Sequence, residues 1–171
     1  VKSDFIITDP GLEITLESDE SVASIMHPED QMQIMNVLYA AHNGVYRMSP
    51  AISGLVETSN NVAVVRIGDG QLSIGCLTRS AVESSKLDMA NVLRAVFELG
   101  GCEVVFSGDY PGWAPNPDSP VLHLLTSLYQ QKYRHAPEVV ACHAGLECGI
   151  LGKNYPGMDM ISFGPTILGA H

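Results

Sequence analysis

Residues 53–78 read SGLVETSNNVAVVRIGDGQLSIGCLT, and this stretch organises the fold that we expect for the chain. It contains two apolar runs, Ser53–Ile67 and Gln71–Thr78, rich in the β-branched residues that favour strands. Gly68-Asp69-Gly70 lies between the runs and is typical of a hairpin turn, because glycine adopts positive φ without steric cost. The stretch therefore predicts a long antiparallel hairpin.

Two helices are predicted beside the hairpin. Pro28 opens the first, and Asn43-Gly44 ends it. The second is predicted to be capped by Ser84 or Ser85 and to stop at Gly100-Gly101. Apolar residues at helical spacing predict the buried faces, which are Met32, Met35, Leu38 and Tyr39 in the first helix and Leu87, Ala90, Leu93, Val96 and Phe97 in the second.

Short strands are predicted at Leu12–Leu16, from strict apolar alternation, and at Glu103–Phe106. The resulting order is strand, helix, strand, strand, helix, strand. This order predicts an α+β segment, in which an antiparallel sheet carries helices on one face.

The composition changes at Ser107–Pro120, which holds four prolines and two glycines and cannot continue a helix or strand. We expect a domain boundary here, which divides the chain into residues 1–109 and 110–171. Beyond it, Ser119 and Pro120 predict a helix start, and Val139–Ala141 and Met158–Phe163 predict strands. A helix between two strands is the unit of a parallel sheet, so the second segment is predicted to be α/β.

The composition excludes several classes of protein. Of 171 residues, 46% are hydrophobic and 16% charged, which indicates a globular protein. The net charge of −10 opposes nucleic-acid binding, and no apolar run reaches the roughly 20 residues of a membrane helix. The four cysteines are not needed as disulfides in a chain of this size, so we expect a reducing, cytoplasmic compartment. The absence of an initial Met, together with a terminal His171, suggests a segment of a longer protein.

Four sites stand out chemically. Residues 142–148, CHAGLEC, have the wrong spacing for a self-contained zinc site and better suit a strand-end turn, where Gly145 would let a ligand approach the backbone. Arg79 ends a strand and is either a carboxylate-binding group or a solvated cation. Asn61 lies in a predicted apolar strand. It is either buried, in which case its amide needs hydrogen-bond partners, or it lies at a bulge or a sheet edge. His171 is either a surface residue or a metal ligand.

Four motifs resemble one family. They read GLVETSNNVAVV at residues 54–65, YPGWAPNPDSPV at 110–121, HAGLECG at 143–149 and MDMISFGPTI at 158–167. Together they resemble the aminoacyl-histidine (Xaa-His) dipeptidases, a carnosinase-like branch of the dinuclear-zinc metallopeptidases. The family has a catalytic α/β domain interrupted by a lid domain. The resemblance places residues 1–109 in the second half of a dimerising lid and residues 110–171 in part of the catalytic domain.

The resemblance also implies roles for individual residues. His171 matches a zinc ligand of the family's Gly-Pro-Thr-Ile-x-Gly-x-His motif. Arg79 is implied to hold the C-terminal carboxylate of a dipeptide, with Asn61 as a further substrate contact. His143, Gly145 and Glu147 match a turn that lines the same site. The family's general base and its other zinc ligands lie upstream of the matched region.

Two functions follow from this resemblance. In the first, the chain is a fragment of a cytoplasmic, homodimeric dipeptidase that uses two zinc ions to activate water. The fragment is expected to be inactive alone, because one histidine cannot hold catalytic zinc. In the second, the chain is a standalone dimerisation or peptide-binding module derived from the lid, without catalysis.

Overall fold

The computed structural model describes residues 2–18, 25–143 and 147–164. The chain divides into residues 1–32 and residues 33–171, which we describe separately. Residues 1–32 contain a short 3₁₀ helix, Lys2–Asp4, and the start of helix α1, Pro28–Ala40. The predicted strand at Leu12–Leu16 is wrong: these residues are irregular, and the Leu16 side chain is 96% exposed. Alternation alone does not make a strand, because the backbone needs a partner strand, and none is described in this unit.

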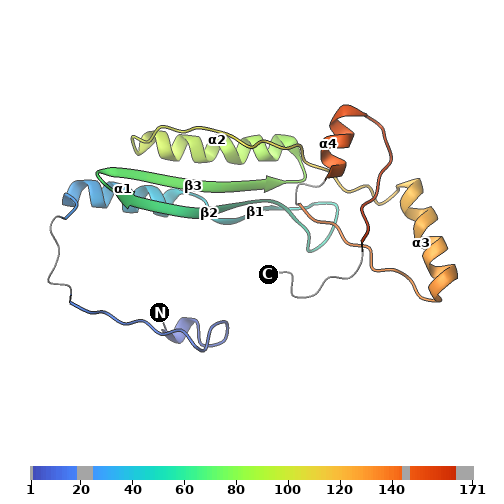
Figure 1. Cartoon of the computed structure of the whole chain (residues 1–171), viewed down its shortest axis with the longest axis horizontal. Coiled ribbons are helices and arrows are strands. Elements are labelled where there is room, and N and C mark those ends of the chain that lie inside the picture. The colour runs from blue at the N-terminus through green and yellow to red at the C-terminus, as the bar shows by residue number, and fades with distance from the viewer. Residues whose placement is uncertain (1, 19–24, 144–146, 165–171) are drawn as a thin grey trace. The chain divides into compact units, whose positions relative to one another are not determined.

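Residues 33–171 are built on the predicted hairpin (Figure 1). Strand β2, Val56–Gly68, pairs antiparallel with β3, Gln71–Ser80, and with the shorter β1, Gly44–Met48, on its other side. The hairpin turns through Asp69 and Gly70, whose φ angles of 51° and 72° are the positive values that a two-residue hairpin turn requires. The hairpin prediction is confirmed. Strand β1 has too weak an apolar alternation to be predicted.

Helices α1 and α2 cover one face of this sheet. Helix α2, Glu83–Leu99, runs along β3 in Figure 1 and buries Met89, Leu93 and Phe97 in a core shared with Val37 and Ala41, from α1 and the residue after it. This core also takes in apolar side chains from all three strands, namely Tyr46, Val62, Ile74 and Cys76. The α+β prediction, with helices on one face of an antiparallel sheet, is confirmed.

The buried faces of both helices were predicted only in part. Leu93 and Phe97 are buried as expected, whereas Leu87 is exposed. In α1 the expected methionine cluster is exposed, and Tyr39 is 95% exposed. The packed side of α1 is instead set by Val37 and Ala41, one turn apart. Met32, Met35 and Tyr39 lie on the opposite side of the helix, because each is displaced from Val37 by roughly 140–160° at 100° per residue.

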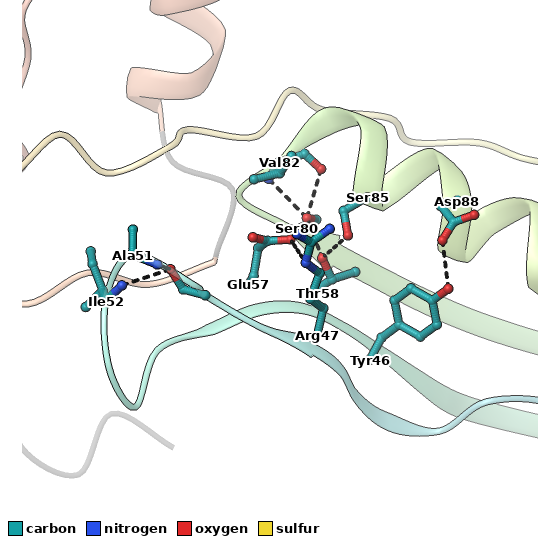
Figure 2. Close-up of polar contacts among 11 residues, drawn as sticks. Tyr46, Arg47, Ala51, Ile52, Glu57, Thr58, Ser80, Val82, Ser85 and Asp88 are labelled. Carbon is teal, nitrogen blue, oxygen red and sulfur yellow. Dashed lines mark hydrogen bonds and ion pairs between the residues drawn. The ribbon is translucent and has the colours of Figure 1, made fainter.

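A buried polar layer joins β2, β3 and the first turn of α2 (Figure 2). Thr58 is completely buried, and its Oγ1 lies 2.8 Å from the hydroxyls of both Ser80 and Ser85. The predicted cap at Ser84 or Ser85 is wrong: both serines lie inside the helix, whose N-cap is Val82 and has no side-chain cap hydrogen bond, and the Ser85 hydroxyl accepts from Thr58 instead. Sequence spacing identified a serine near the helix start but not its tertiary partner.

The second half of the chain contains α3, Pro120–Tyr133, and α4, Glu147–Asn154. Ser119 caps α3 as predicted, by accepting a hydrogen bond from the Leu122 N–H at 3.1 Å. The predicted inward face of α3 is not buried, and Leu124 and Leu128 are exposed. The expected strands at Glu103–Phe106, Val139–Ala141 and Met158–Phe163 are irregular, because the described chain places no partner strand beside them. The division at residue 109 remains a prediction.

Candidate functional site

A concavity of about 320 Å³ lies where β1 begins and β2 passes beside it. The residues that line it come from three places: the start of β1 with the residue before it, the first half of β2 and the segment before α4. They are Asn43, Gly44, Val45, Val56, Ser59, Asn60, Asn61 and His143. Two of the residues singled out in the sequence, Asn61 and His143, therefore lie in one cavity although 82 positions separate them.

His143 is held in this concavity by Ser59. The Ser59 Oγ lies 2.7 Å from the His143 Nε2, in a partly buried contact. Ser59 is on β2, where it pairs in register with Val45 of β1 and with Arg79 of β3. Ser59 thus has strands on both sides, and it joins the segment before α4 to the sheet.

Arg79 lies directly across the β2–β3 ladder from Ser59. Its side chain is exposed, as expected of a group that would bind an anion from solution. Partial burial of the imidazole lowers the pKa of His143, and the nearby positive charge of Arg79 lowers it further. His143 is therefore neutral at pH 7, beside a permanent cation. This pairing suits a ligand with hydrogen-bond acceptors and negative charge, such as a carboxylate.

Asn61 is exposed on β2 opposite Leu77 and lines the concavity. The sequence left open whether it lies at a bulge or edge. β2 is the central strand, and its pairing with β3 shifts between Val62 and Val64, one residue beyond Asn61. Asn61 therefore precedes a bulge on a central strand, and its amide is available to a ligand.

Three polar residues of the site were not predicted, namely Ser59, Asn60 and Asn43. Asn60 is buried, donates from Nδ2 to the His42 carbonyl at 2.7 Å and accepts from the Thr78 hydroxyl at 2.9 Å. Asn43 accepts from the Val62 N–H at 2.8 Å. These bonds fix the wall of the concavity. The available signal was the unbroken polar run Glu57–Asn61, which is followed by the mostly apolar remainder of the strand.

Residues 109–112, which we call the connecting segment, contact helix α2, the end of β3 and helix α4. Lys86 is buried and its Nζ lies 2.6 Å from Asp109 Oδ1, 2.6 Å from the Tyr110 carbonyl and 3.0 Å from Glu83 Oε2. A Cβ added at Gly112 would lie 2.7 Å from the Ala81 carbonyl oxygen, and one at Gly149 would lie 2.6 Å from the Pro111 carbonyl oxygen. At Gly112 and Gly149 the neighbouring backbones are therefore too close to accommodate any residue larger than glycine.

The remaining predicted residues do not join this cavity in the described chain. Glu147 begins α4 and is exposed, outside the set that lines the concavity. Gly145 and His171 lie outside the described residues. Among residues 2–18, 25–143 and 147–164, no three His, Cys, Asp or Glu side chains are grouped to hold a metal ion. Helices in the same ranges include none that is long and apolar enough to cross a membrane.

Known proteins match the chain over all or nearly all of its length. It is 38% identical over 171 residues to the cytosol non-specific dipeptidase of Escherichia coli strain K12, and covers 35% of that protein. It also superposes on the crystal structure of aminoacylhistidine dipeptidase from Vibrio alginolyticus with a TM-score of 0.88 and 38% identity, over 96% of this chain and 34% of that one. No protein-family model matches the chain.

The motif resemblance is therefore confirmed by sequence and by structure, over a region that spans about one third of the relatives. The antiparallel sheet with its helices is part of the matched fold. The chain is therefore homologous to about one third of each of these two dipeptidases.

Proposed function

We propose that the chain is part of a metal-dependent dipeptidase that hydrolyses Xaa-His dipeptides, and that its contribution is to bind the substrate. One observation supports the substrate-binding role above the others. Arg79, Asn61 and His143, identified in the sequence by residue type and motif, line one concavity or pair directly with a residue that lines it. Arg79 would bind the terminal carboxylate, since its planar guanidinium matches carboxylate geometry. Asn61 would contribute an amide, and His143 a neutral imidazole.

We propose that Gly145 and Glu147 extend this substrate site from the turn that follows His143. Glu147 is exposed at the first position of α4, where a carboxylate is favoured by the helix dipole. This part of the proposal comes from the motif HAGLECG and the homology, since residues 144–146 lie outside the described chain.

We propose zinc as the metal, with His171 as one ligand. A catalytic zinc needs about three protein ligands, and the described residues do not supply such a group. The zinc proposal therefore rests on the MDMISFGPTI motif and on the homology, and we derive no reaction step through the metal. We expect the 171-residue chain to be inactive on its own, because a single histidine cannot complete the site.

The assay should use a whole protein that contains this chain. We expect hydrolysis of an Xaa-His dipeptide, its loss on treatment with EDTA and its recovery when Zn²⁺ is restored. His171→Ala should abolish hydrolysis and reduce the bound zinc, while His123→Ala, an exposed position on α3, serves as the matched control. Full activity in His171→Ala would contradict the assignment of this ligand.

We also propose a homodimer in the cytoplasm. The sheet order β1-β2-β3 leaves β1 and β3 each with one edge that carries no partner in the described chain, and such edges can pair between subunits. Free cysteines at positions 76, 102, 142 and 148 suit a reducing compartment. Light scattering of the whole protein should give twice the subunit mass. A dimer of the isolated chain that binds dipeptide without metal would instead favour a standalone module.

A further inference from the structure

Gly112 and Gly149 lie where three stretches of backbone are stacked against one another. A Cβ atom at Gly112 would lie 2.7 Å from the Ala81 carbonyl oxygen and 2.8 Å from that of Ser80. A Cβ atom at Gly149 would lie 2.6 Å from the Pro111 carbonyl oxygen. Neither glycine has a positive φ, so the backbone conformation does not itself require glycine. Glycine is needed at both positions because the backbones approach so closely.

Ser80 and Ala81 form the inner layer of this stack, and this layer is fixed to the sheet. Ser80 ends β3, and its Oγ lies 2.8 Å from the Thr58 Oγ1 in the buried polar layer. Ala81 donates its backbone N–H to the Glu57 carbonyl at 3.0 Å. Peptide groups held in this way cannot move aside for a new methyl group. A larger residue at either glycine must therefore displace the outer layers, which are the connecting segment and α4.

The stack joins the two sides of the candidate site. Arg79 directly precedes the inner layer, and His143 lies four residues before the first residue of α4. His143 also contacts Ser59 at 2.7 Å, so its place in the concavity has two supports, Ser59 and the attachment of α4. We propose that the two glycines are positioning residues, because the close approach that they allow sets how near His143 lies to Ser59 and Arg79.

This spacing matters for a small ligand that both sides must reach. A displacement of about 1 Å takes a polar group out of hydrogen-bonding range. In its consequence for binding, the inference rests on the proposed dipeptidase function, in which His143 and Arg79 contact the same dipeptide. The stacking of the backbones and its effect on the position of His143 do not depend on that function.

Helix α4 itself provides the matched control. Gly152 lies in the same helix, and a Cβ atom there would meet the terminal methyl group of Met160 at 3.2 Å. This methyl group ends a flexible side chain and can move aside. Gly149→Ala and Gly152→Ala thus add the same methyl group to the same helix, with the same gain in helix propensity. Only Gly149→Ala presses on a backbone.

NMR of the chain itself measures the position of His143. A nuclear Overhauser effect between the His143 ring and Ser59 is expected in the unsubstituted chain and in Gly152→Ala. It should be lost or strongly reduced in Gly149→Ala and in Gly112→Ala. The titration midpoint of His143 should also rise toward about 6.5 in these two variants, because the imidazole becomes less buried. An unchanged Overhauser effect in both variants would overturn the proposal.

Urea unfolding separates an effect on the site from an effect on the fold. The described core of sheet and helices contains no residue of α4. Gly149→Ala should therefore unfold at nearly the same urea concentration as Gly152→Ala. Loss of the folded core in Gly149→Ala would show that α4 supports the fold rather than the site, and would overturn the proposal.

Kinetics of the whole dipeptidase test what the positioning does. Gly149→Ala should raise KM for an Xaa-His dipeptide about 2- to 10-fold, the effect of losing one neutral hydrogen bond, with a smaller change in kcat. Gly152→Ala should leave both constants unchanged. An unchanged KM in Gly149→Ala, measured on an active enzyme, overturns the role of the glycines in the site while the dipeptidase function stands. Absence of hydrolysis in the unsubstituted protein overturns the proposed function, and the NMR comparison still decides whether the glycines position His143.

Discussion

Ser59 Oγ and His143 Nε2 lie 2.7 Å apart although 84 residues separate them in the chain. This bond connects the central strand of the sheet to the segment that precedes α4. It also brings His143 close enough to Arg79 for the charge of that arginine to lower the imidazole pKa. The candidate site therefore combines residues from both sides of the Pro-rich segment 107–120.

Substitution of Arg79 tests carboxylate binding. Arg79→Met in the whole dipeptidase should raise KM for a dipeptide about 10- to 100-fold, since a hydrogen bond to a charged group contributes about 1.5–3 kcal/mol. Arg66→Met is the matched control, because Arg66 is an exposed arginine at the other end of the same hairpin. Equal KM values for the two variants would remove Arg79 from the binding site.

Titration of His143 tests the electrostatics of the site. We expect its NMR midpoint below the ordinary value of about 6.5, because burial and Arg79 both disfavour the imidazolium. Arg79→Gln should raise the midpoint only in part, since burial is the larger cause and remains. Arg66→Gln should leave it unchanged.

The same pKa shift has a consequence for stability. Because the folded-state pKa is depressed, the neutral ring's contribution to stability is fully present above about pH 6.5. It is lost as the pH falls through the lowered folded-state pKa. His143→Gln should therefore reduce the acid dependence of the unfolding free energy in this window. An identical pH dependence would contradict the shift.

Met89 is expected to dominate the stability of the sheet–helix core. It is completely buried between α2 and the strands, so Met89→Ala should cost about 2–5 kcal/mol through lost burial and an unfilled cavity. Leu99→Ala, at the end of the same helix where the side chain is 89% exposed, should change the unfolding free energy little. Urea unfolding measures both, and similar losses would show that the core lies elsewhere.

Lys86 is expected to hold the connecting segment to α2. Lys86→Met should destabilise the chain by about 1–3 kcal/mol, because it removes the partner of Asp109 and of the Tyr110 carbonyl. Lys132→Met on α3 is an exposed control. Chemical unfolding of the two variants gives the comparison, and an effect no larger than that of the control would argue against the role of Lys86.

The Lys86–Asp109 pair also predicts a pH dependence. Hydrogen bonding to Lys86 lowers the pKa of Asp109, so its contribution is present above pH 3.8 and is lost as the pH falls through the lowered value. Burial favours neutral Lys86, but hydrogen bonds to Asp109 and Glu83 outweigh it and raise the lysine pKa. That contribution is present below pH 10.5 and is lost as the pH rises through the raised value. Lys86→Met should weaken both dependences.

Local sequence predicted the elements whose determinants are local. The Gly68-Asp69-Gly70 turn and the Ser119-Pro120 helix start form as expected, because φ preferences and side-chain caps act within a few residues. The expected strands at Leu12–Leu16 and Met158–Phe163 do not form in the described chain. A strand depends on a partner, which apolar pattern alone does not specify.

The sequence by itself determined the hairpin, the presence of helices α1, α2 and α3 and the resemblance to dipeptidases, and it identified Arg79, Asn61 and His143 by residue type and motif. Only the tertiary structure decided that Asn61 and His143 line one concavity, that Arg79 lies across from Ser59, and that Ser59 bonds the His143 ring. The physical reason is that strand register and a contact across 84 residues arise from packing and long-range hydrogen bonds. No local preference encodes the partner of a side chain that far along the chain.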